Sequence, residues 1–138
     1  MGLGTVTGGA FQAQSGENFK IAEIKMTQAP SLNPAVIIRK GEDFKLTVKF
    51  EFTEILGDLH AQYVFDMFAH NIATGGVEAT YNIHKEDTLP TAPPNSIVVS
   101  FDIKNVQALG IFKYNSVVTL PDSDIAAFIE GPVFAVIP

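Results

Sequence analysis

Cysteine and tryptophan are both absent from this chain of 138 residues. Without cysteine no disulfide framework can form, and every zinc site built on thiolate ligands is excluded. A chain without disulfides fits a reducing compartment, so a cytoplasmic location is the default expectation. Exported domains without cysteine are also common, and the compartment stays open.

Positive charge is scarce as well. The chain has 9 Lys and Arg against 15 Asp and Glu, which gives a formal net charge of −6. Binding to nucleic acid or to an anionic membrane depends on clustered cations, so we expect neither partner.

The sequence also shows no pattern typical of a signal peptide or of a transmembrane segment. The opening stretch MGLGTVTGGAFQAQSG has neither the basic nor the apolar region of a signal peptide. The apolar closing stretch FIEGPVFAVIP is too short to span a bilayer, and Glu130, Gly131 and Pro132 interrupt it. We therefore expect no signal peptide and no transmembrane segment in this chain.

What the chain does contain is enough apolar sequence for one core. Hydrophobic residues make up 46% of it, and there are 11 Phe. This composition and length predict one globular domain. Residues 1–18 are rich in Gly, Gln, Ser and Thr, and we interpret them as a flexible Gly-rich arm that precedes a folded domain over residues 19–138.

Alternation of apolar and polar residues is the dominant pattern. In EDFKLTVKFEFTE every second position from Phe44 to Phe52 is apolar, which predicts a strand with one buried face. Six further runs are also typical of strands and cover roughly residues 19–27, 60–72, 77–85, 96–104, 111–120 and 132–138. About seven short strands without a long helix predict an all-β fold, a single antiparallel β-sandwich of Greek-key, immunoglobulin-like type. A small β-barrel is the alternative.

The order of these segments resembles that of the immunoglobulin-like and fibronectin-like sandwiches. EDFKLTVKFEF matches the second strand, YVFDMFAH the third, SIVVSFDI the fifth, GIFKYNSVVTL the sixth and FIEGPVFAVIP the last. The chain also weakly resembles uncharacterised bacterial domains, such as those of cyanobacteria, that end in a similar Glu-Gly-Pro strand. The antibody-type cysteine pair and tryptophan are missing, and Tyr114 is a weak candidate for the tyrosine corner. Since such sandwiches host many unrelated activities, the resemblance implies a fold and no functional residue.

The histidines are the first candidates for chemistry. His60 and His70 are separated by ten residues, or about 33 Å of strand, and cannot bind one ion together. A three-residue turn at 74–76 would place Asp66 opposite His84 on the outer face. This pair is either half of an acid–base or metal site or an exposed strand pair. We favour the exposed pair and expect no enzyme and no cofactor, because no third ligand or nucleophile is indicated.

Outward apolar residues are the stronger indication of function. Val64, Phe68 and Ile72 fall on the polar side of their strand, where they either form a partner surface or are covered by loops of the same chain. We predict a non-enzymatic interaction or structural module that binds protein or itself, as a possible homodimer, through an apolar sheet face or a strand edge. The alternative is a sandwich that binds calcium, carbohydrate or a small molecule with its end loops, for which Asp122 and Asp124 are weak calcium candidates.

Overall fold

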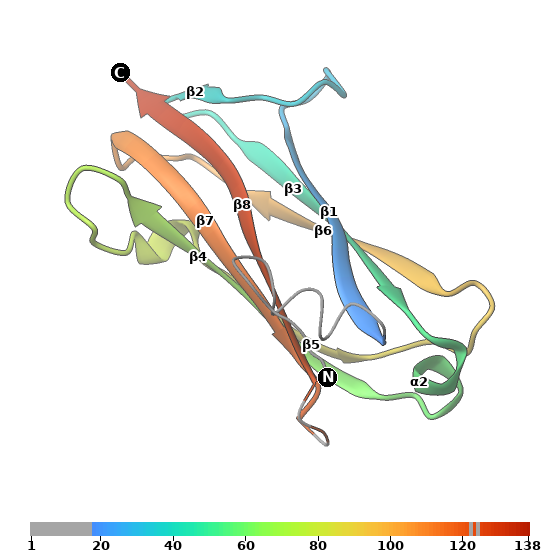
Figure 1. The fold of residues 1–138 in the computed structure, drawn as a ribbon. Helices are drawn as coiled ribbons and strands as arrows, with labels where there is room; N and C mark the ends of the chain where they lie inside the picture. The colour runs from blue at the N-terminus through green and yellow to red at the C-terminus, as the bar shows by residue number, and fades with distance from the viewer. Residues whose placement is uncertain (1–17, 122, 124) are drawn as a thin grey trace.

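The computed structural model describes residues 18–121, 123 and 125–138. In these residues the chain forms eight strands in two sheets, which face each other across one core (Figure 1). The prediction of an all-β, sandwich-like fold is confirmed. The predicted arm falls almost entirely on residues 1–17, which lie outside the described residues.

Sheet A has three strands and sheet B has five. Sheet A has the order β1 (Phe19–Thr27), β3 (Phe44–Phe52) and β6 (Ser96–Ile103). Sheet B has the order β2 (Ile37–Arg39), β8 (Ala126–Ile137), β7 (Gly110–Thr119), β4 (Gln62–Asn71) and β5 (Ile83–Thr88). A short helix, α2 (Glu54–Asp58), and a 3₁₀ turn, η2 (Ala79–Tyr81), complete the fold. No helix in the described part of the chain is long and apolar enough to cross a membrane.

Strand β3 has the buried face that its alternation predicts. Its apolar positions are all buried, while the residues between them are exposed or half-buried. It pairs antiparallel with β1 on one side and β6 on the other, so it is the central strand of sheet A. A register shift between Ile21 and Glu23 interrupts the pairing of β1 with β3.

Aromatic side chains join the two sheets. Phe50 of β3 lies 5.4 Å from Tyr63 and 5.1 Å from Phe65 of β4, measured between ring centroids. On β7, Tyr114 is fully buried, and its hydroxyl donates a hydrogen bond of 2.7 Å to the carbonyl of Tyr81. Such rings contribute both large apolar area and favourable edge-to-face geometry, so they account for much of the cohesion of the core.

One segment differs from the sequence-based expectation. The stretch after Pro34 is not among the strand-like runs, but it leads into β2, which pairs parallel with β8. The N–H of Ala35 donates to Met26 in sheet A, and the carbonyl of Val36 accepts from Ala135 in sheet B. The backbone thus crosses from one sheet to the other. The expectation of an antiparallel sandwich is wrong for this pair, whereas eight strands agree with the expected number of about seven.

The hairpin of β4 and β5 is predicted correctly at its base and wrongly near its turn. Asp66 lies opposite His84, as the apolar alternation requires. Closer to the turn, the register set by a three-residue turn at 74–76 would place His70 opposite Thr80, but His70 faces Val77 instead. The intervening residues form η2. The side chain of Glu78, which precedes this turn, accepts a hydrogen bond from the N–H of Thr80 and so caps its first residues.

Candidate functional site

The outer face of sheet B carries the residues that the sequence singles out. On β4, the alternation that buries Tyr63, Phe65 and Met67 turns their neighbours outward. Residues that lie directly opposite each other on neighbouring strands point to the same face of the sheet. The pairings of β4 with β5 and β7, and of β7 with β8, therefore show which residues make up this surface.

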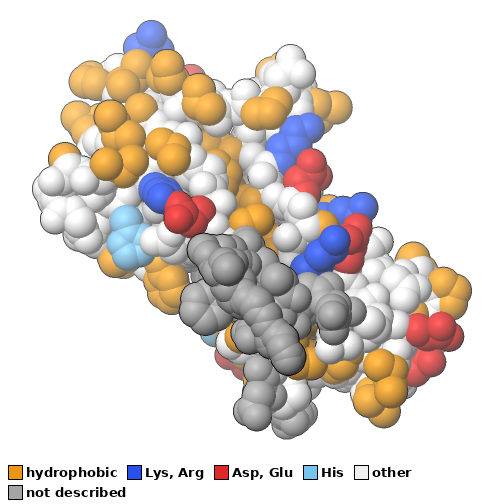
Figure 2. All heavy atoms as spheres, in the orientation of Figure 1, with side chains coloured by type: hydrophobic (Ala, Val, Ile, Leu, Met, Phe, Trp, Pro, Cys, Tyr) orange, Lys and Arg blue, Asp and Glu red, His pale blue; other side chains and the backbone are white. Residues whose placement is uncertain are grey.

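Four apolar residues form one row across this face. Ile37 on β2 lies opposite Ala135 on β8, and Ala135 lies opposite Ile111 on β7. Ile72, just beyond β4, donates its N–H to the carbonyl of Ile111 and continues the row. Ile37, Ile111 and Ile72 are 57%, 53% and 55% exposed. Figure 2 shows hydrophobic side chains gathered at the upper left, over the end of sheet B where β8 ends. We call these four residues the apolar row.

The next positions on the same face combine apolar and charged side chains. Val133, which is 48% exposed, lies opposite Lys113 on β7, and Lys113 lies opposite His70 on β4. Lys113 also forms an ion pair with Glu130 of β8. The apolar row is therefore bordered on one side by the ion pair of Lys113 and Glu130, and on the other by Arg39, which shares the outer face of β2 with Ile37.

The three predicted interface residues share this face but do not form one cluster. Ile72 belongs to the apolar row. Phe68, 39% exposed, lies opposite the polar Asn115. Val64 is half-buried and lies farther along β4, opposite Thr119. The apolar surface that a partner could cover is therefore centred on the row and not on Phe68.

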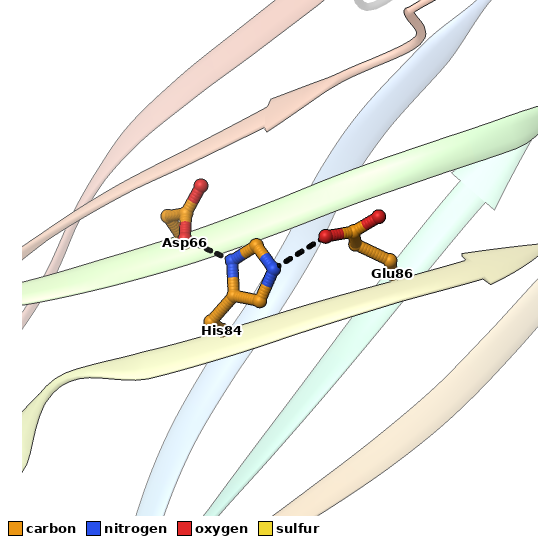
Figure 3. A network of polar contacts seen from close by, with 3 residues as sticks. All are labelled: Asp66, His84 and Glu86. Carbon is orange, nitrogen blue, oxygen red and sulfur yellow. Dashed lines mark hydrogen bonds and ion pairs between the residues drawn. The ribbon is translucent and has the colours of Figure 1, made fainter.

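His84 lies between two carboxylates (Figure 3). Its Nδ1 is 2.6 Å from Asp66 Oδ1, and its Nε2 is 2.8 Å from Glu86 Oε2. The hydrogen bond to Asp66, followed by that to Glu86, raises the pKa of the imidazole above its usual value. The group is solvent-exposed, so the pair is screened and contributes little to stability.

This arrangement offers neither a base nor a metal centre. A general base needs a nitrogen that can reach the substrate, but both nitrogens of His84 are engaged with carboxylates. Within the described ranges, no group of three or more His, Cys, Asp or Glu side chains is placed to hold a metal ion. His60 lies elsewhere, with its Nδ1 3.1 Å from the carbonyl of Leu89. The calcium candidates Asp122 and Asp124 lie outside the described residues.

A groove of about 550 Å³ lies between β1 and β8. Its lining is mainly apolar and includes Ile24, Ile129 and Gly131. A Cβ atom at Gly131 would lie 3.5 Å from the hydroxyl of Ser116, which is buried and has no hydrogen-bond partner among the described residues. The groove runs along the side of the sandwich, whereas the ligand-binding alternative places its site in the end loops.

Sequence reasoning missed most of the apolar row. Ile111 shares its strand face with Lys113 and Asn115, and this mixed face was the available signal. Ile37 belongs to a strand of three residues in a stretch rich in proline. Neither residue can be connected to Ile72 without knowing that β8 and β7 lie between β2 and β4.

Comparison with known proteins identifies a fold and no family. No protein-family model and no curated protein matches the sequence. Among solved structures, the C-terminal domain of wzt has a TM-score of 0.57 and 11% identity over 88% of this chain and 74% of that one. The alkylpurine DNA glycosylase AlkC of Pseudomonas fluorescens has a TM-score of 0.49 and 16% sequence identity, and the match covers 88% of this chain and 31% of that one. A β-glucosidase from Listeria innocua has a TM-score of 0.48 and 14% sequence identity, and the match covers 87% of this chain and 16% of that one. At 11% identity, the likeness to the wzt domain concerns the fold alone.

Proposed function

We propose that this chain is a non-enzymatic interaction module that associates with a second copy of itself through the apolar row. We further propose that its sandwich is of the immunoglobulin-like, Greek-key type. The strand order β1-β3-β6 against β2-β8-β7-β4-β5 supports this type, since strands that follow each other in sequence repeatedly change sheets.

The apolar row carries the proposal. Three isoleucines, each about half exposed, stand in line across neighbouring strands. Covering the exposed half of one such side chain contributes about 1 kcal/mol. Contiguous exposed apolar surface of this kind is typical of protein interfaces, whereas single exposed apolar residues scattered over a surface are ordinary.

A second copy is the partner that the charges around the row favour. The chain has a net charge of −6, yet the charged side chains beside the row are Arg39 on one side and the ion pair of Lys113 and Glu130 on the other. A two-fold axis through Ile111 can set the lysine of one copy near the glutamate of the other. Such an isologous contact is the commonest way in which identical chains associate.

Light scattering of the full chain and two variants tests this function. Ile111→Lys places a charge at the centre of the row. Val98→Lys is the matched control, because Val98 is 61% exposed on the outer face of sheet A and the change of side chain is similar. Phe68→Lys measures how far the contact extends along β4.

The expected result is a wild-type dimer that Val98→Lys leaves intact and that Ile111→Lys converts to monomer. Phe68→Lys is expected to weaken the dimer less than Ile111→Lys does, since its neighbour is polar. A wild-type chain that stays monomeric up to high concentration would contradict the proposal. Equal loss of the dimer in Ile111→Lys and Val98→Lys would also contradict it.

A further inference from the structure

The edge strands of the two sheets differ in how they are protected. Protein edges are normally blocked by charged side chains, bulges or very short strands. In sheet B, β5 has the charged sequence IHKEDT, and β2 has three residues. In sheet A, β1 carries a register shift and the charges Lys20, Glu23 and Lys25. Strand β6, SIVVSFDI, has no bulge and only Asp102 as a charge.

The backbone groups of β6 that point away from sheet A can be identified. The carbonyl of Asn95 accepts a hydrogen bond of 3.0 Å from the N–H of Phe52 in β3. The register between β3 and β6 is unbroken from there to Ile103. In an antiparallel pair the backbone groups alternate in direction, so the odd-numbered residues bond to β3. The N–H and C=O groups of Ser96, Val98, Ser100 and Asp102 therefore point to the open edge, where no strand of the described chain pairs with them.

Apolar side chains at this edge are incompletely covered. On the inner face of β3, Val48 and Phe50 are fully buried. On the inner face of β6, Ile97, Val99 and Phe101 are only half-buried, although they pack against the same core. Among the described residues, no strand covers the core beyond β6.

The opposite sheet extends farther on this side. Phe101 of β6 stacks on Phe65 of β4, with ring centroids 6.1 Å apart. Strand β5 lies beyond β4 in sheet B, and β6 is the last strand of sheet A. On the inner face of β5, Lys85 is half-buried and Asp87 is exposed. The two side chains form an ion pair, with Nζ and Oδ2 3.5 Å apart. Around Phe101, therefore, no strand of the described chain occupies the position beside β6 that lies opposite β5.

We propose that the edge of β6 binds an extended peptide segment of another protein as a fourth strand of sheet A. The backbone of the segment pairs with the outward groups of β6, which is the mode known as strand addition. Its inward side chains lie beside Ile97 and Phe101 and above the ion pair of Lys85 and Asp87. The segment that fits is uncharged or nearly so, alternates apolar with small polar residues and lacks proline at the pairing positions.

A complete second copy does not fit the same edge. Pairing β6 with the β6 of a second copy would bring that copy's own sheet B along with it. Around Phe101, where β6 lies over β4 and β5 extends beyond it, the β4 of the second copy would then need the place that β5 occupies here. A lone segment has no second sheet, so it meets no such obstacle.

A synthetic peptide with the sequence of residues 95–104 is a suitable probe. Paired antiparallel about Val99, it sets Ile97 opposite Phe101, and its even-numbered backbone groups face the outward groups of β6. N-methylation of the peptide at Val99 blocks its free edge and prevents the peptide from stacking on itself. N-methylation at Val98 instead blocks the edge that faces the protein. Binding of both fluorescein-labelled peptides is followed by fluorescence anisotropy with the full chain.

Two variants of the protein separate backbone from side chain at the edge. Ser100→Pro removes an N–H that points outward and bonds to no strand of the described chain, so the pairing with β3 is preserved. Ser100→Ala keeps that N–H and removes only the hydroxyl. Circular dichroism and the melting temperature confirm that both variants are folded.

The expected result is saturable binding of the peptide methylated at Val99. Ser100→Pro should weaken it by roughly tenfold or more, and Ser100→Ala should leave it within about twofold. The peptide methylated at Val98 should not bind. Absence of binding by the first peptide, or equal binding to Ser100→Pro, would overturn the proposal. A wild-type dimer that Ser100→Pro converts to monomer would overturn it as well, because a second copy would then occupy the edge. Binding by Ile111→Lys is expected to be normal, so this outcome is independent of the apolar row.

Discussion

The hydrogen bond between Tyr114 and Tyr81 allows a quantitative test of the core. The hydroxyl of Tyr114 donates to the carbonyl of Tyr81 at 2.7 Å, and the ring is fully buried. Burial also raises the pKa of this hydroxyl, so it stays protonated and remains a donor throughout the accessible pH range. Tyr114→Phe removes the donor and changes the shape of the side chain very little.

The cost follows from the burial of the carbonyl that loses its partner. A typical hydrogen bond contributes about 1 kcal/mol, but a buried acceptor left without a partner costs about 1–3 kcal/mol. Because Tyr114 has no exposed surface, water cannot readily replace the lost hydroxyl. We expect Tyr114→Phe to lower the free energy of unfolding by about 2 kcal/mol. For a domain of this size, that corresponds to a fall in Tm of roughly 6–10 °C.

Urea unfolding and thermal melting of three matched variants provide the assay. Tyr81→Phe removes a hydroxyl that donates to the half-buried Ala108 at 2.7 Å, so its cost should be smaller. Tyr63→Phe removes a hydroxyl that bonds to no described residue, so its cost should be smallest. A loss in Tyr114→Phe no larger than that in Tyr63→Phe would refute the reasoning.

Two further predictions concern positions outside the proposed interfaces. Gly131→Ala should destabilise the fold by about 1–3 kcal/mol in urea unfolding, because its Cβ would lie 2.9 Å from Cβ of Tyr114. Gly76→Ala, whose nearest neighbour is a side-chain oxygen at 3.4 Å, should change stability little, and equal effects would contradict this. In an NMR titration, the pKa of His84 should lie above its ordinary value and fall in Asp66→Asn. The pairing of protonated His84 stabilises the fold fully below the unfolded-state pKa of about 6.5 and is lost as pH rises through the higher folded-state pKa. An unchanged pKa in Asp66→Asn would exclude the pair as its cause.

Local pattern was sufficient for the elements whose register depends on one or two neighbouring strands. The alternation in β3 predicts its buried face, because side chains of a strand alternate between two faces. The opposition of Asp66 and His84 follows from keeping the apolar faces of β4 and β5 together. Both predictions use only sequence positions close along the chain.

The apolar row was beyond such reasoning because it depends on strand order. Ile37, Ile111 and Ile72 come from three distant segments, and only the order β2-β8-β7-β4 brings them into line. Strand β2 itself has too few residues to show a period, and its place is set by its parallel pairing with β8, far along the chain. The sequence therefore indicated Val64, Phe68 and Ile72 on β4, and of these only Ile72 belongs to the apolar row.

Cross-linking through a single introduced cysteine is the most direct test of self-association through the apolar row. The chain has no cysteine of its own, so one thiol reports one position without background. Because packed sheet faces lie about 10 Å apart, a bismaleimide of roughly that span joins equivalent residues near a two-fold axis. Ile111→Cys should give a covalent dimer at high yield, and Val98→Cys should stay monomeric under the same conditions. A covalent dimer from Val98→Cys with none from Ile111→Cys would contradict the account.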